Sequence, residues 1–133
     1  MAKRKLSARP TDAELEILNV LWQRGAATVR DVHQAISRTK PAAGYTTVLK
    51  TMQIMAEKGL VRRDESQRAH VYEAQVAQEQ TQRQLVGDLL ERAFDGSAAK
   101  LVMQALSTRK ATAEELSTLR EMLDDFERGG GKR

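Results

Sequence analysis

Apolar residues recur at helical spacing through the first part of the chain. Two sets follow each other with steps of three and four residues: Leu15, Leu18 and Trp22, then Val29, Val32 and Ile36. Such spacing places the apolar side chains on one face of a helix. Thr11 and Thr28 precede these sets, each with an acidic residue three positions later, which is typical of a helix N-terminus. We therefore predict a helix from Thr11 to Gly25 and a second helix that begins at Thr28.

A third apolar set predicts a helix over residues 45–58. Its apolar side holds Val48, Leu49, Met52, Met55 and Ala56, and its polar side holds Thr46, Thr47, Lys50 and Gln53. Neutral hydrogen-bonding groups with a single lysine suit the edges of DNA bases better than scattered charges do. Ile54 is the exception on the polar side. It either touches a thymine methyl or a sugar, or packs against the loop around Pro41, and we favour the packing.

The residues that follow predict a β-hairpin. Two short segments of strand character, residues 60–64 and 69–73, flank a polar turn. A hairpin directly behind a helix with a DNA-reading face is the arrangement of a winged helix-turn-helix. Alternation along a strand sends Arg62 and Arg63 to opposite faces. Arg68 at the turn is therefore the better candidate for a phosphate contact, and plain surface charge is the alternative for all three arginines.

The last part of the chain predicts helices over residues 77–94 and 98–106, and a further helix that begins at Thr112. Two of them carry apolar stripes: Leu85, Leu89 and Phe94 in the first, and Leu116, Leu119, Leu123 and Phe126 in the last. One small segment cannot bury both stripes. They either fold back on the winged domain or meet a second copy, and we predict a homodimer. The expected fold is thus mainly α: a winged helix-turn-helix DNA-binding domain over residues 1–75, with three helices and a small antiparallel hairpin, and a helical dimerisation domain over residues 76–133.

Charge is distributed unevenly between these two parts. Residues 1–75 hold 13 Lys and Arg against 8 Asp and Glu, giving +5, whereas the remainder holds 9 against 10, giving −1. A basic excess confined to the first part indicates a polyanionic partner there. Lys3, Arg4, Lys5 and Arg9 are either a flexible arm that adds salt-sensitive affinity or a solubilising terminus. No apolar run is long enough to span a bilayer, so we expect a cytoplasmic protein without membrane insertion.

Catalytic and metal-binding patterns are absent from the sequence. His33 and His70 are the only histidines, no cysteine is present, and no carboxylate lies at metal-ligand spacing from either histidine. No Ser/His/Asp order and no glycine-rich phosphate loop is found. We therefore expect no enzymatic activity, no metal and no cofactor.

Four motifs together resemble the BlaI/MecI/CopY-type penicillinase-repressor family over about residues 9–125. They are residues 14–18 with Trp22, residues 45–48 (Tyr-Thr-Thr-Val), residues 58–61 (Lys-Gly-Leu-Val) and residues 70–72 (His-Val-Tyr). The resemblance implies a homodimeric winged-helix repressor with interlocked C-terminal helices. It also implies an inverted-repeat operator in promoter DNA, often with TACA and TGTA half-sites. Genes of the β-lactamase type would be derepressed when the dimer or its DNA binding is lost.

Induction differs between branches of this family. In antibiotic-responsive members, a membrane sensor protease leads to cleavage of an Asn-Phe bond in the repressor. Gln104-Ala105 stands at the corresponding place here, so the resemblance does not imply that this chain is cleaved at that bond. Copper-responsive members use paired Cys-x-Cys motifs, which a chain without cysteine cannot provide. A ligand-sensing regulator and a winged helix used for protein interaction are the alternatives to an operator-binding repressor.

For the DNA interface we predict seven residues: Tyr45, Thr46, Thr47, Lys50, Gln53, Arg63 and Arg68. The threonines can hydrogen-bond to bases or pack a methyl group against thymine. Lys50 can reach guanine or a phosphate, and Gln53 can read adenine. The hydroxyl of Tyr45 either meets a phosphate or belongs to a half-buried side chain with a structural role. Ordinary solvation of a helix surface is the alternative for the polar face as a whole.

Overall fold

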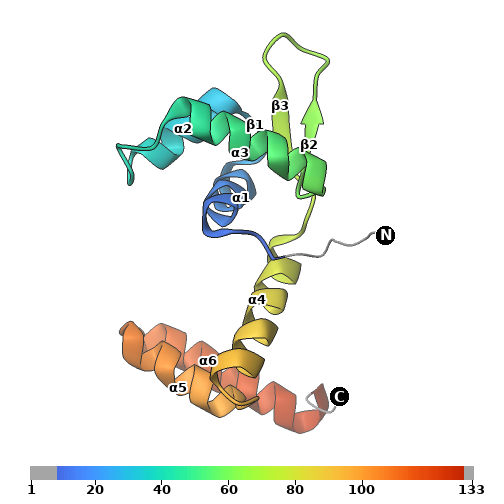
Figure 1. The fold of residues 1–133 in the computed structure, drawn as a ribbon. Helices are drawn as coiled ribbons and strands as arrows, with labels where there is room; N and C mark the ends of the chain where they lie inside the picture. The colour runs from blue at the N-terminus through green and yellow to red at the C-terminus, as the bar shows by residue number, and fades with distance from the viewer. Residues whose placement is uncertain (1–8, 131–133) are drawn as a thin grey trace. The chain divides into compact units, whose positions relative to one another are not determined.

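The computed structural model describes residues 9–130 and forms two compact units, the first ending at Gly87 and the second beginning at Asp88. The first unit contains, in chain order, α1 (Asp12–Arg24), β1 (Ala27–Thr28), α2 (Val29–Ser37), α3 (Tyr45–Lys58), β2 (Val61–Asp64), β3 (Val71–Ala74) and the start of α4 (Gln78–Ala93) (Figure 1). The three predicted helices and the hairpin are all present. The basic residues Lys3, Arg4 and Lys5 lie outside the described part of the chain.

The first two helices begin where the sequence places their caps. Thr11 Oγ1 accepts a hydrogen bond from the Glu14 amide at 3.2 Å, and Glu14 Oε1 accepts from the Thr11 amide at 2.9 Å. Thr28 and Asp31 form the same reciprocal pair at the start of α2, with distances of 3.1 and 3.2 Å. Each box satisfies backbone N–H groups that have no partner within the helix. Both predicted caps are confirmed.

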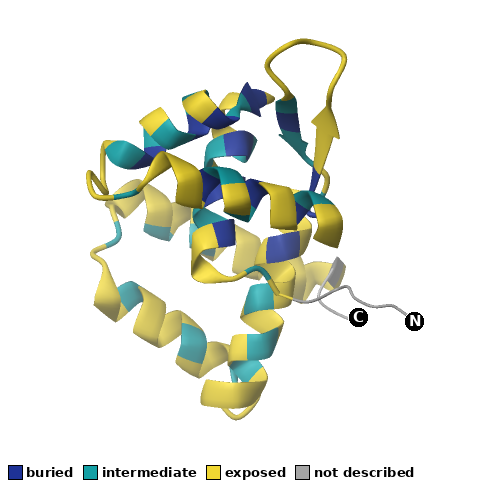
Figure 2. Cartoon of the chain, turned by 45° about the horizontal axis from the view of Figure 1, so that its top comes forward, coloured by how far each residue is buried: buried dark blue, intermediate teal, exposed yellow. Residues whose placement is uncertain are grey.

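A single apolar core holds the helices of the first unit together. The buried members are Ile17, Leu18, Leu21, Ala27, Val29, Val32, Ile36, Val48, Met52, Met55, Leu60, Val61 and Tyr72. Helices α1, α2 and α3 each contribute residues spaced three or four apart, as the sequence pattern predicts. Figure 2 shows buried and exposed segments alternating along these helices, which is the mark of one face turned inward. The core therefore fixes which side of α3 faces solvent.

The sheet has one strand more than predicted. Strands β2 and β3 form the expected antiparallel hairpin, with Arg63 opposite Tyr72. Strand β1 pairs with the other edge of β3, where Ala27 lies opposite Tyr72. The order is thus β1-β3-β2. No strand was predicted at Ala27 and Thr28, because two residues carry no alternation to recognise. Tyr72, in the central strand, is only 1% exposed.

The chain leaves the sheet through an anchored segment that leads into α4. The Trp22 indole donates a hydrogen bond to the Val76 carbonyl at 2.9 Å, and the Gln75 amide donates to the Leu60 carbonyl at 2.8 Å. Thr81, in the first turn of α4, is buried. A division at residue 75, as expected from the sequence, falls before α4, whereas the first compact unit continues to Gly87.

The second unit contains the end of α4, then α5 (Ala98–Thr108), α6 (Ala113–Asp125) and a short turn of π-helix, η2 (Phe126–Gly130). The predicted helices are present, and α5 runs two residues further than expected. No residue from Asp88 to Gly129 is buried. Figure 2 shows these helices as exposed or intermediate along their whole length. The unit has apolar side chains but no core of its own.

None of the helices within residues 9–130 is both long enough and apolar enough to cross a bilayer.

Candidate nucleic-acid interface

The outward face of α3 carries the residues predicted to read DNA. Val48, Met52 and Met55 are buried and hold the opposite face against the core. The predicted helix residues are all exposed: Tyr45, Thr46, Thr47, Lys50 and Gln53. From the start of α3 to Ala56 this helix has no acidic residue. The face is therefore free to meet a polyanion, and its contact with DNA stays a prediction.

Ile54 lies on this outward face and is 41% exposed. It does not belong to the core, and it is not among the partly buried apolar residues that pack against the core. Its exposure argues against the packing that the sequence analysis favoured. A branched apolar side chain is thus presented to solvent on a helix face that is otherwise polar.

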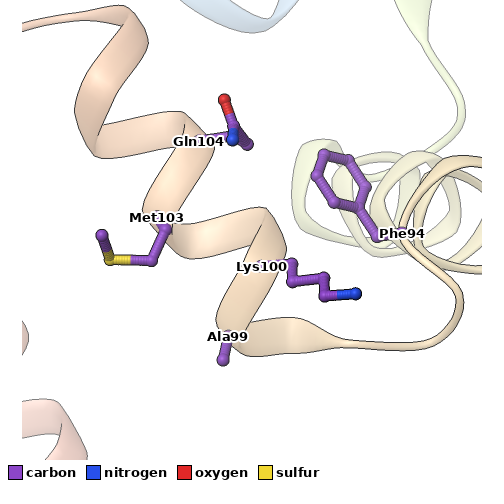
Figure 3. A pocket seen from close by; sticks show the side chains of 5 residues that line it. All are labelled: Phe94, Ala99, Lys100, Met103 and Gln104. Atoms are coloured by element: carbon purple, nitrogen blue, oxygen red, sulfur yellow. The ribbon is translucent and has the colours of Figure 1, made fainter.

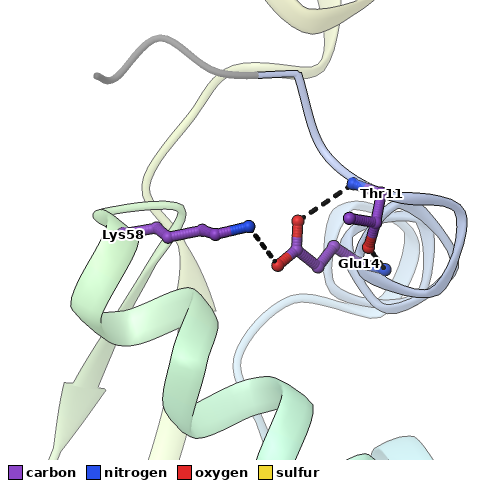
Figure 4. Close-up of polar contacts among 3 residues, drawn as sticks. All are labelled: Thr11, Glu14 and Lys58. Atoms are coloured by element: carbon purple, nitrogen blue, oxygen red, sulfur yellow. Dashed lines mark hydrogen bonds and ion pairs between the residues drawn. The ribbon is translucent and has the colours of Figure 1, made fainter. Parts of the chain in front are cut away.

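The C-terminal end of α3 is tied to the start of α1 by a charged contact. Lys58 Nζ lies 2.8 Å from Glu14 Oε2, and Glu14 Oε1 accepts from the Thr11 amide, so both carboxylate oxygens are engaged (Figure 4). Glu14 is only 3% exposed. A buried carboxylate with two partners fixes the spacing between the two helices. The ammonium group of Lys58 also lies at the end of α3 where a helix dipole favours positive charge.

The N-terminal end of α3 is held by an aromatic contact. The rings of His33 and Tyr45 meet edge to face, with their centroids 5.6 Å apart. His33 Nε2 lies 2.9 Å from the carbonyl oxygen of Ala43, in the loop before α3. Tyr45 itself is 47% exposed. Its ring therefore supports the helix start and is still partly accessible. A structural role and a phosphate contact by the Tyr45 hydroxyl are thus compatible.

The arginines of β2 already have partners within the wing, here defined as residues 61–74. Arg62 forms an ion pair with Glu73 on the neighbouring strand, and this hydrogen bond raises the pKa of the Arg62 guanidinium. A hydrogen bond with Tyr72 raises the pKa of Arg63, which also lies 2.6 Å from Glu65. Both guanidinium groups are thus compensated by the wing itself.

Arg68 differs from the other two wing arginines. It lies in the turn between the strands and is exposed. No residue within the described part of the chain forms an ion pair with it. The turn has its own internal support, because Asp64 Oδ1 accepts from the Ser66 amide at 2.9 Å, which lowers the pKa of Asp64. Arg68 is therefore the wing arginine whose charge is uncompensated.

A surface hollow of about 620 Å³ joins α3 to the wing. It brings together four of the seven predicted residues: Tyr45, Gln53, Arg63 and Arg68. Thr46, Thr47 and Lys50 do not line it. Arg30 and His70 do line it, and Arg30 was not among the predicted residues. The available signal was its position in the first turn of the helix capped by Thr28.

Positively charged side chains predominate around this hollow. Three arginines and a histidine line the hollow against one acidic residue, Asp31. Guanidinium groups suit phosphate oxygens, because each can donate two parallel hydrogen bonds. Within residues 9–130, no cluster of three His, Cys, Asp or Glu side chains is placed to hold a metal ion.

The residues predicted for dimerisation lie on α4 and α6, except Phe94 and Phe126, which directly follow these helices. Leu85, Phe94, Leu116 and Leu119 are half-buried, whereas Leu89, Leu123 and Phe126 are 47%, 65% and 62% exposed. A hollow of about 420 Å³ lies beside α5 and is lined by Phe94, Ala99, Lys100, Met103 and Gln104 (Figure 3). Whether these apolar residues contact a second copy stays a prediction.

Comparisons with known proteins give a family match and related chains. The family model for the penicillinase repressor matches residues 10–125. The transcriptional regulator BlaI of Mycobacterium tuberculosis, in strains CDC 1551 and H37Rv, is 33% identical over 123 residues, covering 92% of this chain and 88% of that protein. A penicillinase repressor of Bacillus licheniformis is 23% identical over 116 residues, covering 86% of this chain and 89% of that protein. A solution structure of the DNA-binding domain of the repressor BlaI matches with a TM-score of 0.50 and 23% identity, over 56% of this chain and 90% of that chain, which supports the fold.

Proposed function

Because the chain belongs to the penicillinase repressor family, we propose that it is a transcriptional repressor that binds an inverted-repeat operator as a homodimer. Proteins of this family are transcriptional repressors and not enzymes. The observation that carries the proposal is the outward face of α3, where Thr46, Thr47 and Lys50 are exposed and no acidic residue occurs before Glu57. A face without negative charge, beside the uncompensated Arg68 of the wing, favours contact with a polyanion.

In the proposed complex, α3 lies in the major groove and the wing contacts the backbone. The first turns of a recognition helix approach base edges, while neighbouring elements grip phosphates. Thr46, Thr47 and Lys50 would then meet bases. Gln53, which lines the hollow between α3 and the wing, would lie towards one edge of the contact. Arg68 supplies the uncompensated charge that the backbone attracts.

The apolar side chains of the second unit support the homodimer. No residue from Asp88 to Gly129 is buried, and apolar area exposed to water costs free energy that association with a second copy recovers. Leu89, Leu123 and Phe126 are the most exposed of the predicted contact residues. A two-fold dimer presents two recognition helices roughly 34 Å apart, which is one turn of DNA. The operator should therefore be an inverted repeat.

Derepression in this proposal follows from loss of the dimer or of its contact with DNA. Each half-site alone binds weakly, so separating the subunits releases the operator. This proposal does not include induction by cleavage at Gln104-Ala105. In antibiotic-responsive family members, the bond whose cleavage depends on a membrane sensor protease joins Asn to Phe, and this chain has a different pair there. The place of action is the cytoplasm, where chromosomal DNA is accessible.

The test begins with genome-fragment selection by the purified full chain. Enriched fragments should share an inverted repeat, and a gel-shift titration of that repeat should weaken as salt rises because counterions are released from DNA. Lys50→Ala should weaken binding. Lys110→Ala is the matched control, since it removes the same charge from an exposed position in the second unit. Sedimentation should give the same dimer for both variants.

Two outcomes would contradict the proposal. Failure to enrich any duplex would favour a winged helix used for protein interaction. Equal loss of affinity in Lys50→Ala and Lys110→Ala would show that α3 does not form the contact.

A further inference from the structure

We propose that Ile54 reads the 5-methyl group of a thymine in the operator and so helps to set the preferred sequence. This inference rests on the proposed function, because it requires α3 to lie in the major groove. It adds a specificity-determining residue that the seven predicted contacts do not include. The observation behind it is an aliphatic side chain, 41% exposed, on the face of α3 opposite the core.

The position of Ile54 places it with the proposed base contacts. It follows Lys50 by four residues and Thr47 by seven, and residues at these spacings share one face of a helix. The inward side is marked independently by the buried residues Met52 and Met55. A helix that lies along a groove contacts bases through one such stripe of side chains. If Thr47 and Lys50 reach base edges, Ile54 faces the same groove about one turn further on.

Ile54 has no other explanation within its own unit. Before α4, the exposed large apolar residues of the described chain are Tyr45 and Ile54. Tyr45 packs its ring against His33. Ile54 belongs neither to the core nor to the partly buried apolar residues that pack against it. Exposure of an aliphatic side chain to water is unfavourable, and an apolar partner that arrives with DNA would cover it.

The chemistry of the side chain restricts what it can recognise. Ile54 has no hydrogen-bond donor, so it cannot bind a phosphate and cannot distinguish bases by their donors and acceptors. In the major groove, thymine alone presents a methyl group, and apolar side chains discriminate it by contact. Deoxyribose is the other apolar surface within reach, but contact with a sugar does not depend on the base.

Deoxyuridine provides the direct probe because it lacks only the 5-methyl group of thymine. Each thymine of the selected operator is replaced in turn by deoxyuridine, in both half-sites, and affinity is measured at one salt concentration. For the unmodified protein, replacement of the thymine at one position should lower affinity by about fourfold per half-site. This is the effect expected for loss of one buried methyl group. Ile54→Ala should bind the thymine and deoxyuridine operators equally, and Ile54→Val should keep part of the difference.

Thr47→Ser is the matched control, because it removes a methyl group from another side chain on the same stripe. This variant should still lose affinity when the thymine assigned to Ile54 is replaced by deoxyuridine. Unchanged melting temperatures would show that the Ile54 variants fold normally, as expected for an exposed side chain.

The inference is overturned if no thymine replacement affects the unmodified protein, or if Ile54→Ala keeps the full difference. Specific operator binding would persist in both cases, so the proposed function would survive. Absence of specific binding to any duplex would instead remove both proposals together.

Discussion

The contact between Glu14 and Lys58 offers a direct test of how α3 is held in place. Replacing Lys58 by methionine keeps most of the apolar stem but removes the ammonium group that lies 2.8 Å from Glu14 Oε2. The Glu14 side chain is only 4% exposed, so water has little access to its carboxylate. The Thr11 amide at 2.9 Å would remain as its hydrogen-bond partner. The variant therefore leaves a buried charge that is only partly satisfied.

The loss in the free energy of unfolding expected for Lys58→Met lies between two limits. Breaking a fully buried ion pair costs about 3–5 kcal/mol, whereas an exposed pair contributes about 0–1 kcal/mol. Lys58 is 40% exposed, so water can replace part of what is lost, and we expect Lys58→Met to lower the free energy of unfolding by about 2 kcal/mol. Combining it with Glu14→Gln removes the unpaired charge. The double variant should therefore cost less than the sum of the single variants, with a coupling of about 1–2 kcal/mol.

Urea denaturation of the full chain at one fixed protein concentration measures these costs. Trp22 is the only tryptophan and lies in the same unit, so its fluorescence reports this transition. Lys40→Met is the matched control, because Lys40 Nζ lies 2.7 Å from Oε2 of Glu16, which is on α1 like Glu14. The side chains of Lys40 and Glu16 are well exposed, at 59% and 37%. The control should cost no more than about 0.5 kcal/mol. Equal costs for Lys58→Met and Lys40→Met, or a coupling near zero, would refute the argument from burial.

Three further predictions follow from the wing, the second unit and a cap. Arg68→Ala should weaken operator binding more than Arg62→Ala, because Arg62 is already paired with Glu73; gel shifts showing the reverse order would contradict this. Phe126→Asp should shift sedimentation towards monomer and weaken operator binding with it, whereas an unchanged mass would place the dimer contact elsewhere. The backbone hydrogen bond from Thr28 lowers the pKa of Asp31, so this carboxylate stabilises the fold above its ordinary pKa and loses that effect as pH falls through the lowered value. The stability advantage over Asp31→Asn should therefore shrink in urea titrations between about pH 5 and pH 2, and an advantage that grows on acidification would be inconsistent with the cap.

Local signals in the sequence predicted most of the first unit. The caps at Thr11 and Thr28 involve residues three positions apart, and the inward face of α3 follows from periodicity alone. Such features are short-range, so one sequence suffices to find them. Strand β1 was missed because a two-residue strand exists only through its pairing with β3.

Contacts between distant residues could not be predicted in the same way. Glu14 and Lys58 lie 44 positions apart, and only the packing of α1 against α3 brings them together. The compensation of Arg63 depends on Tyr72, which reaches it across the hairpin. Ile54 was recognised as an exception on the polar face, but periodicity could not tell packing from exposure. Tertiary arrangement decided each of these cases.

The exposed apolar side chains of α4 and α6 have a consequence for gene dosage. If the protein binds its operator only after two copies meet, the occupied fraction at low abundance rises with the square of the monomer concentration. Halving the cellular amount of the protein would then reduce operator occupancy about fourfold, in place of the twofold loss expected for a monomer. Regulated genes would respond steeply to growth, dilution or turnover, even without a dedicated inducer.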